Sequence, residues 1–196
     1  MSDKRNDFIS YNDFVLYGEK IIVSLLNQSN IERYLSTYKR ASAFAEIYER
    51  MPDFWEKPRQ WIEDCVAGER SDKERYLIDE KVSLQGCGYI ELNYENPEMP
   101  DVDIAILEEY RGKGYAFEAA QILIENVLKR ESVECIIWNA FASNKASRRI
   151  AEKLGGVLVD GKNVIVEAMR SAGFKMDEID DSKISKMVTY EIRRND

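Results

Sequence analysis

The residues with the clearest chemical meaning form a short glycine loop, Arg111-Gly112-Lys113-Gly114-Tyr115-Ala116, between a strand pattern and an amphipathic helix pattern. Glycines at the start of a helix let the backbone approach a ligand closely, and the free N–H groups of the first turn favour an anion such as phosphate. The loop therefore predicts an anion cradle, in which the arginine adds positive charge or merely caps the helix. A plain structural turn is the alternative, since a G-x-G pair alone is weak evidence of binding.

The loop does not match two other phosphate-binding patterns. The spacing GxxxxGK[ST] of nucleoside triphosphatases is absent, and a GxGxxG dinucleotide fingerprint would need glycine at the position of Phe117. Nucleotide binding is therefore the least favoured function for this loop.

Two carboxylates lie on the strand pattern that precedes the loop. Asp101 and Asp103 are two residues apart, so both side chains fall on one face of a strand, while Val102 and Ile104 fall on the other. Two neighbouring carboxylates raise one another's pKa, which suits a general base. The same pair could instead bind a cationic amine, or form a solvated strand end.

Composition narrows the class of chemistry. The chain has no histidine, which excludes Ser-His-Asp hydrolysis, Cys-His chemistry and His-ligated metals. Its three cysteines, Cys65, Cys87 and Cys135, are scattered, so we expect buried thiols in a reducing compartment and no metal site. The net charge of −8 argues against a nucleic-acid partner and suits a cationic amine.

Length and hydrophobic periodicity predict one α+β domain over residues 1–196. Apolar residues make up 44% of the chain, without a run long enough to span a membrane, and the charged extension 1–13 lacks a signal core, so we expect a cytoplasmic protein. Segment 160–185 is an atypical insertion before the last strand. The patterns predict strands at 21–26, 76–78, 87–94, 101–107, 133–141 and 186–192, and helices at 31–51, from Pro58 to Gly68, after the glycine loop and at 145–154.

A second motif lies in the last predicted helix, which reads Asn144-Lys145-Ala146-Ser147 at its start and Glu-Lys-Leu-Gly at its end. Asn144 and Ser147 are one turn apart and share a face. Taken singly, the asparagine is a helix cap and the serine a solvated helix residue.

The two motifs together resemble the GNAT superfamily of acyl-CoA-dependent N-acetyltransferases. The family's loop follows Gln/Arg-x-x-Gly-x-Gly/Ala, which Arg111, Gly114 and Ala116 fill in order, and its last helix carries Asn-x-x-Ser. The loop region is most similar to the ribosomal-protein alanine N-acetyltransferase branch, through Glu118-Ala119.

The resemblance implies a mixed, mostly antiparallel central sheet flanked by helices, with a splayed pair of central strands. Pantetheine would lie between those strands, against backbone groups of Ile104 and Ile106 on one side and Asn139 on the other. The glycine loop would hold the diphosphate, and the Asn-x-x-Ser helix would lie along the CoA arm. Ile104 N–H would polarise the thioester carbonyl, and Asp101 or Asp103 would be the base.

The family's usual tyrosine acid falls at Ala151, so no general acid is assigned. The implied function is transfer of an acetyl group from acetyl-CoA to a primary amine by direct attack, without a metal. The acceptor stays open between a protein N-terminus and a small amine such as a polyamine. The alternative is a non-catalytic acyl-CoA-binding module for sensing or assembly. Homodimers are common in the family, but no segment of the sequence identifies an interface.

Overall fold

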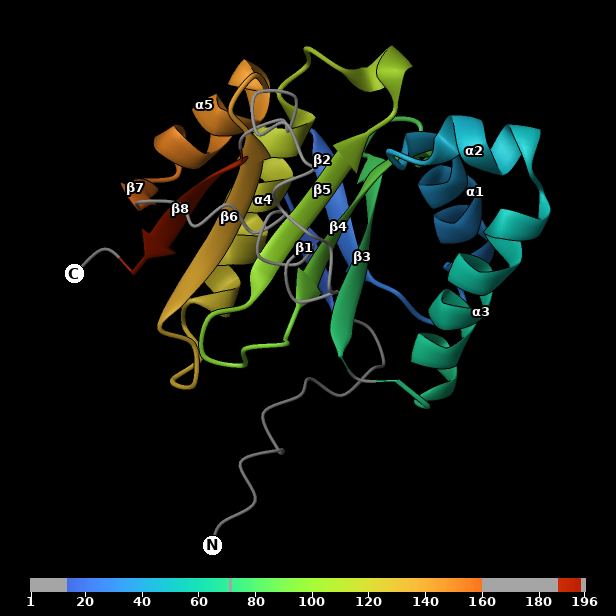
Figure 1. The fold of residues 1–196 in the computed structure, drawn as a ribbon, viewed down its shortest axis with the longest axis horizontal. Helices are drawn as coiled ribbons and strands as arrows, with labels where there is room; N and C mark the ends of the chain where they lie inside the picture. Colours follow the sequence, from blue (N-terminus) through green and yellow to red (C-terminus); the bar gives the residue numbers. More distant parts are fainter. Residues whose placement is uncertain (1–13, 71, 160–186, 195–196) are drawn as a thin grey trace, which may run out of the picture.

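Eight strands form one sheet in the order β1-β2-β3-β4-β5-β6-β8-β7 (Figure 1). The structure is a computed structural model that describes residues 14–70, 72–159 and 187–194, so the predictions for 1–13 and 160–185 lie outside the described residues. The strands are β1 (Val15–Tyr17), β2 (Ile21–Leu25), β3 (Lys73–Glu80), β4 (Gly86–Asn93), β5 (Asp101–Ile106), β6 (Cys135–Phe141), β7 (Val157–Val159) and β8 (Met187–Arg193). Every neighbouring pair is antiparallel except β5 and β6, which confirms the predicted mixed, mostly antiparallel sheet.

Helices cover both faces of this sheet because its strands alternate apolar side chains between the faces. Helix α4 (Tyr115–Val127) lies behind the sheet in Figure 1 and packs on Ile90 and Leu92 of β4. The opposite face carries Tyr89, which packs with helices α1 (Ile31–Ala41) and α3 (Asp53–Ala67) in a second core cluster. The three cysteine thiols are buried, as predicted.

The N-terminal helices differ from the prediction. The expected helix over 31–51 is two helices, α1 (Ile31–Ala41) and α2 (Ala45–Arg50), because the chain turns at Ser42. Helix α3 (Asp53–Ala67) begins before Pro58, which was wrongly predicted to start it. The proline lies in the second turn, where it removes only one helix hydrogen bond, and burial of the helix on its neighbours outweighs that loss. Gly68 ends α3, as predicted, and the structure shows it in the left-handed conformation.

The parallel pair β5 and β6 is joined only at its beginning. Register pairs link Asp101 to Ile137 and Val102 to Trp138, and no further pair joins these two strands within the described residues. The remaining parts of both strands diverge, so a gap opens toward their carboxyl ends. The splayed central pair is therefore present.

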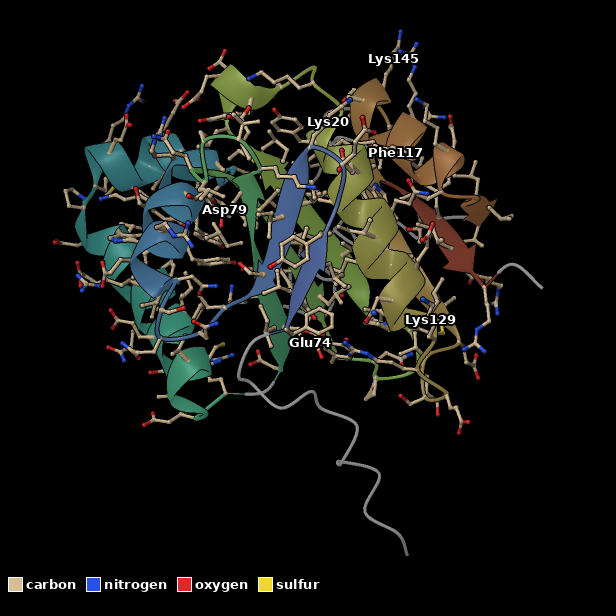
Figure 2. The ribbon with its side chains drawn as sticks, turned by 180° about the vertical axis from the view of Figure 1, so that it is seen from behind. Lys20, Glu74, Asp79, Phe117, Lys129 and Lys145 are labelled. Atoms are coloured by element: carbon tan, nitrogen blue, oxygen red, sulfur yellow. The ribbon has the colours of Figure 1, made fainter. Side chains whose placement is uncertain are left out.

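Two helix N-termini lie at the end of the molecule where this gap opens. Figure 2 shows Phe117, near the start of α4, and Lys145, the first residue of α5 (Lys145–Lys153), at the same end, with Lys129 at the other. The short 3-10 helix η1 (Glu108–Tyr110) leads from β5 to the glycine loop. Among the helices of the described residues, none is both long and apolar enough to cross a membrane.

Candidate active site

The glycine loop has the geometry of an anion cradle. Gly112 and Gly114 have φ of 77° and 88°, which L side chains rarely adopt, and a Cβ at either position would meet no atom of the described residues within 4 Å. Gly114 is the N-cap of α4, and no side chain of the described residues caps this end. The first-turn N–H groups therefore have no capping partner there, and the helix dipole adds positive potential beside them.

The loop is tied to the splayed strand by an arginine. Arg111 Nε donates to the backbone carbonyl of Ile106 at 3.1 Å, at the end of β5. This contact fixes the arginine at the mouth of the β5–β6 gap, beside the open side of the cradle. The guanidinium thus adds positive charge where the gap and the cradle meet.

The other two polar side chains of the loop converge on Glu80, at the end of β3. Tyr115 OH donates to the Glu80 carboxylate at 2.5 Å, and Lys113 Nζ lies 3.7 Å from the same carboxylate. The hydrogen bond from Tyr115, then one from Ser83, and the charge of Lys113 lower the pKa of Glu80. Sequence reasoning missed this residue, because it comes from a strand that ends more than thirty residues before the loop.

Every second residue of β5 directs its backbone N–H and C=O groups toward the gap. Leu107 N–H donates to Cys87 on the β4 side, whereas Pro100 carbonyl accepts from Ile137 of β6. Successive residues of a strand direct their N–H and C=O groups to opposite sides, so the groups of Ile104 and Ile106 point toward β6. At Ile104, where β5 and β6 are no longer paired, this leaves a donor and an acceptor lining the gap.

The residues predicted on β6 and α5 already have protein partners. Asn144 caps α5 by accepting from Ser147 N–H at 3.1 Å, while Ser147 Oγ accepts from Trp138 Nε1 at 2.9 Å. Asn139 Oδ1 accepts from Thr189 Oγ1 at 2.8 Å. These contacts orient the polar groups beside the gap and leave the Ser147 hydroxyl proton and the Asn139 amide N–H groups as donors.

Both predicted aspartates lie on the face of the sheet covered by α1 and α3, opposite α4. Asp103 is accessible to solvent, yet protein atoms surround it so closely that lost hydration, followed by the charge of Glu91, raises its pKa. Lost hydration also raises the pKa of Asp101, against the effect of a hydrogen bond from Asn93 at 3.1 Å. An accessible carboxylate with a raised pKa is what a general base requires.

Sequence reasoning missed the groups that surround Asp103. Tyr89 OH donates to Asp103 at 3.3 Å, and its ring packs on Tyr38 of α1 at 4.6 Å between centroids. Glu91 lies directly opposite Asp103 in the register of β4 and β5. The sequence contained one signal for Glu91, which is a charged residue within an apolar strand pattern. Its position beside Asp103 depends on the register between β4 and β5, which neither strand's sequence specifies alone.

Glu91 is held by a buried network. Its carboxylate accepts from Tyr34 OH at 2.6 Å, from Arg75 Nη1, and from Lys73 Nζ at 3.5 Å. Burial raises the pKa of Tyr34 most, and the Glu91 charge raises it further. Burial alone would lower the pKa of Arg75, but the Glu91 carboxylate outweighs it, so this arginine stays charged. The network therefore fixes the position of the Glu91 carboxylate next to Asp103.

A sheet that splits at a central parallel pair, beside an anion cradle, defines the class of fold. Residues 20–157 match the acetyltransferase (GNAT) domain, which is more than half of the chain. The chain therefore belongs to the GNAT acetyltransferase family, as the motifs predicted.

Individual relatives agree with this family. The chain is 36% identical over 86 residues to the uncharacterized N-acetyltransferase YjdG of Bacillus subtilis (strain 168), a match that spans 44% of this chain and 48% of that protein. Its fold resembles RimL, a ribosomal L7/L12 alpha-N-protein acetyltransferase solved with coenzyme A, at a TM-score of 0.65 and 13% identity over 92% of this chain and 98% of that one. It also resembles the ribosomal-protein-S5-alanine acetyltransferase of Vibrio fischeri, at a TM-score of 0.61 and 15% identity over 91% and 95%.

Proposed function

We propose that this chain transfers an acetyl group from acetyl-CoA to a primary amine by direct attack of the amine. The observation that carries the proposal is the junction of three features at one place. An anion cradle meets the open end of the β5–β6 gap through Arg111, and Asp103 lies on the same strand as the backbone groups that face the gap.

The residues around this junction fit acetyl-CoA. A diphosphate would lie beside Gly112 and Gly114, where no described atom is within 4 Å of a built Cβ, and the N–H groups at the start of α4 and the Arg111 guanidinium would hold it. Backbone groups of Ile104 and Ile106, with Asn139 across the gap, would bind the pantetheine amides. When bound, acetyl-CoA supplies a thioester whose carbonyl carbon is open to attack by an amine.

Two groups on β5 would assist the reaction, one by accepting a proton and the other by stabilising the negative charge that develops. Asp103 takes a proton from the amine. The raised pKa of Asp103 lies closer to the pKa of the amine than that of an ordinary aspartate does, which makes Asp103 a better base. Ile104 N–H donates to the carbonyl oxygen, where negative charge develops. Ala151, at the family's usual acid position, has no proton to donate, and a thiolate is a weak enough base for water to protonate it.

Calorimetric titration with acetyl-CoA tests the binding half of this proposal, with ATP and NAD as controls. Binding of acetyl-CoA alone is expected. Thiol release with a panel of peptides and small amines then tests the transfer. Tight binding without turnover on any amine would favour the non-catalytic acyl-CoA-binding module, and absence of binding by a folded sample would end both hypotheses.

A further inference from the structure

The hairpin formed by β3 and β4 holds both ends of the glycine loop. Loop residues 111–114 are flanked by two tyrosines, and each of them contacts this hairpin. Tyr110 OH donates to Gln85 Oε1 at 3.5 Å, just before β4, and Tyr115 OH donates to Glu80 Oε1 at 2.5 Å, at the end of β3. A loop that contains two left-handed glycines is therefore attached at both ends to the same element.

Lys113, which lies between the two glycines, is directed toward the same carboxylate. Its Nζ lies 3.7 Å from Glu80 Oε1, 4.8 Å from the centroid of the Tyr110 ring and 5.7 Å from that of the Tyr115 ring. Cation–π contacts of this length add to the attraction of the ion pair. One carboxylate and two aromatic rings thus surround the ammonium group in the middle of the loop.

The hairpin also fixes the Glu80 carboxylate. Ser83 Oγ donates to its Oε2 at 2.8 Å, and the backbone of Glu80 makes hydrogen bonds of 2.8 Å with Leu84 and 2.9 Å with Gln85. The hydrogen bond to Glu80 raises the pKa of Tyr115 to about 12, so the tyrosine hydroxyl keeps its proton and remains a donor at neutral pH. Glu80 is therefore a fixed acceptor to which the loop is attached.

The position of this carboxylate opposes simple electrostatics. A negative charge beside the cradle repels a diphosphate, and Glu80 also pairs with Lys113, a cation that would otherwise be free to attract the phosphates. Charge alone would therefore make Glu80 unfavourable for binding. A loose loop, however, must be ordered when a ligand binds, and glycines have the most backbone freedom to lose. A residue that orders the loop beforehand removes that cost.

We propose that Glu80 is a positioning residue of the acetyl-CoA site, which orders the glycine loop before the diphosphate binds. It acts through Tyr115 and Lys113 without touching the ligand, and the order that it imposes strengthens binding more than its charge weakens it. This inference rests on the proposed acetyltransferase function and adds a residue to the same site.

Calorimetric titration with acetyl-CoA compares the wild type with three variants. Glu80→Ala removes both attachments, Glu80→Gln keeps an oxygen that accepts from Tyr115 but lacks the charge that attracts Lys113, and Tyr115→Phe removes only the hydroxyl group. Asp79→Asn is the matched control. Asp79 precedes Glu80 on β3, but its partner, at 3.2 Å, is Arg33 of α1 on the other face of the sheet.

Glu80→Ala should raise the Kd for acetyl-CoA about tenfold, and Tyr115→Phe about fivefold because it leaves Lys113 attached. Glu80→Gln should recover part of the loss, with a Kd about threefold above that of the wild type. The double variant should bind no more weakly than Glu80→Ala, because both substitutions remove one shared interaction. Without ligand, amide hydrogen exchange of residues 110–116 should be faster in Glu80→Ala than in the wild type. Asp79→Asn should change neither the Kd nor this exchange.

The sign of the change in affinity decides between order and charge. Unchanged or tighter binding by folded Glu80→Ala would overturn the inference and leave acetyl-CoA binding intact, and an equal loss in Asp79→Asn would do the same, since hairpin stability would then explain it. If Glu80→Ala does not fold, wild-type affinity in Tyr115→Phe would overturn the inference. Absence of binding by the wild type would overturn the proposed function as well.

Discussion

A single methyl group at Gly114 should separate the role of the glycine loop in binding from its role in folding. Gly114 has φ of 88° and open space where a Cβ would lie, so Gly114→Ala introduces backbone strain without a clash. The strain of a left-handed alanine, partly offset by a less flexible unfolded chain, should lower the free energy of unfolding by about 1 kcal/mol. For a chain of this size that corresponds to a fall in Tm of about 2–4 °C.

The effect on acetyl-CoA should be larger. The methyl group occupies the space that a diphosphate needs in order to reach the N–H groups at the start of α4. Losing one hydrogen bond to a charged group costs about 1.5–3 kcal/mol, so Kd should rise about 10- to 150-fold. Calorimetric titration measures the affinity, and thermal unfolding measures the stability.

Gly68 provides the matched control. It has φ of 77°, equally open space, and a position at the end of α3, outside the loop. Gly68→Ala should therefore lose a similar amount of stability and keep the wild-type affinity for acetyl-CoA. If Gly114→Ala binds within about twofold of the wild type while folded, or if both variants lose affinity equally, the assignment of the cradle is wrong.

The remaining predictions concern the carboxylates. Asp103→Asn should lower kcat about 10²- to 10⁴-fold and remove the acidic limb of the pH–rate profile, because activity is lost as the pH falls through the raised pKa of Asp103. That raised pKa means that the folded state holds this proton more tightly, so the free energy of unfolding falls as pH rises from about 4 through the folded pKa; thermal unfolding of Asp103→Asn should lack this contribution. Tyr89→Phe removes a hydrogen bond to the carboxylate, so the acidic limb should move to higher pH, and an unmoved limb would show that Tyr89 does not tune the base. Arg75→Met should reduce stability in chemical denaturation by about 3–5 kcal/mol, because it leaves Glu91 buried without its main partner, and adding Glu91→Leu should restore much of that loss.

Much of the fold was predictable because it depends on local patterns. The alternation along β4 and β5 identified those strands and put Asp101 and Asp103 on one face. The glycine loop predicted the start of α4, and Asn144 predicted the cap of α5, since both depend on backbone conformations within a few residues. The N-terminal helices were harder, since proline is also a common first-turn residue and the burial that overrides this preference at Pro58 comes from packing of α3 against α1 and α2.

The surroundings of the candidate site were decided by tertiary structure. The registers of β3, β4 and β5 place three side chains near Asp103, which the local sequence did not predict: Glu91, Arg75 and Tyr89. Glu80 reaches the glycine loop in the same way, across the sheet from the end of β3. The sequence by itself determined the residue types and the local motifs, because spacing along the chain specifies turns, caps and faces. Only the folded sheet decided which charges are buried together, because pairing between strands brings together residues that the chain holds far apart.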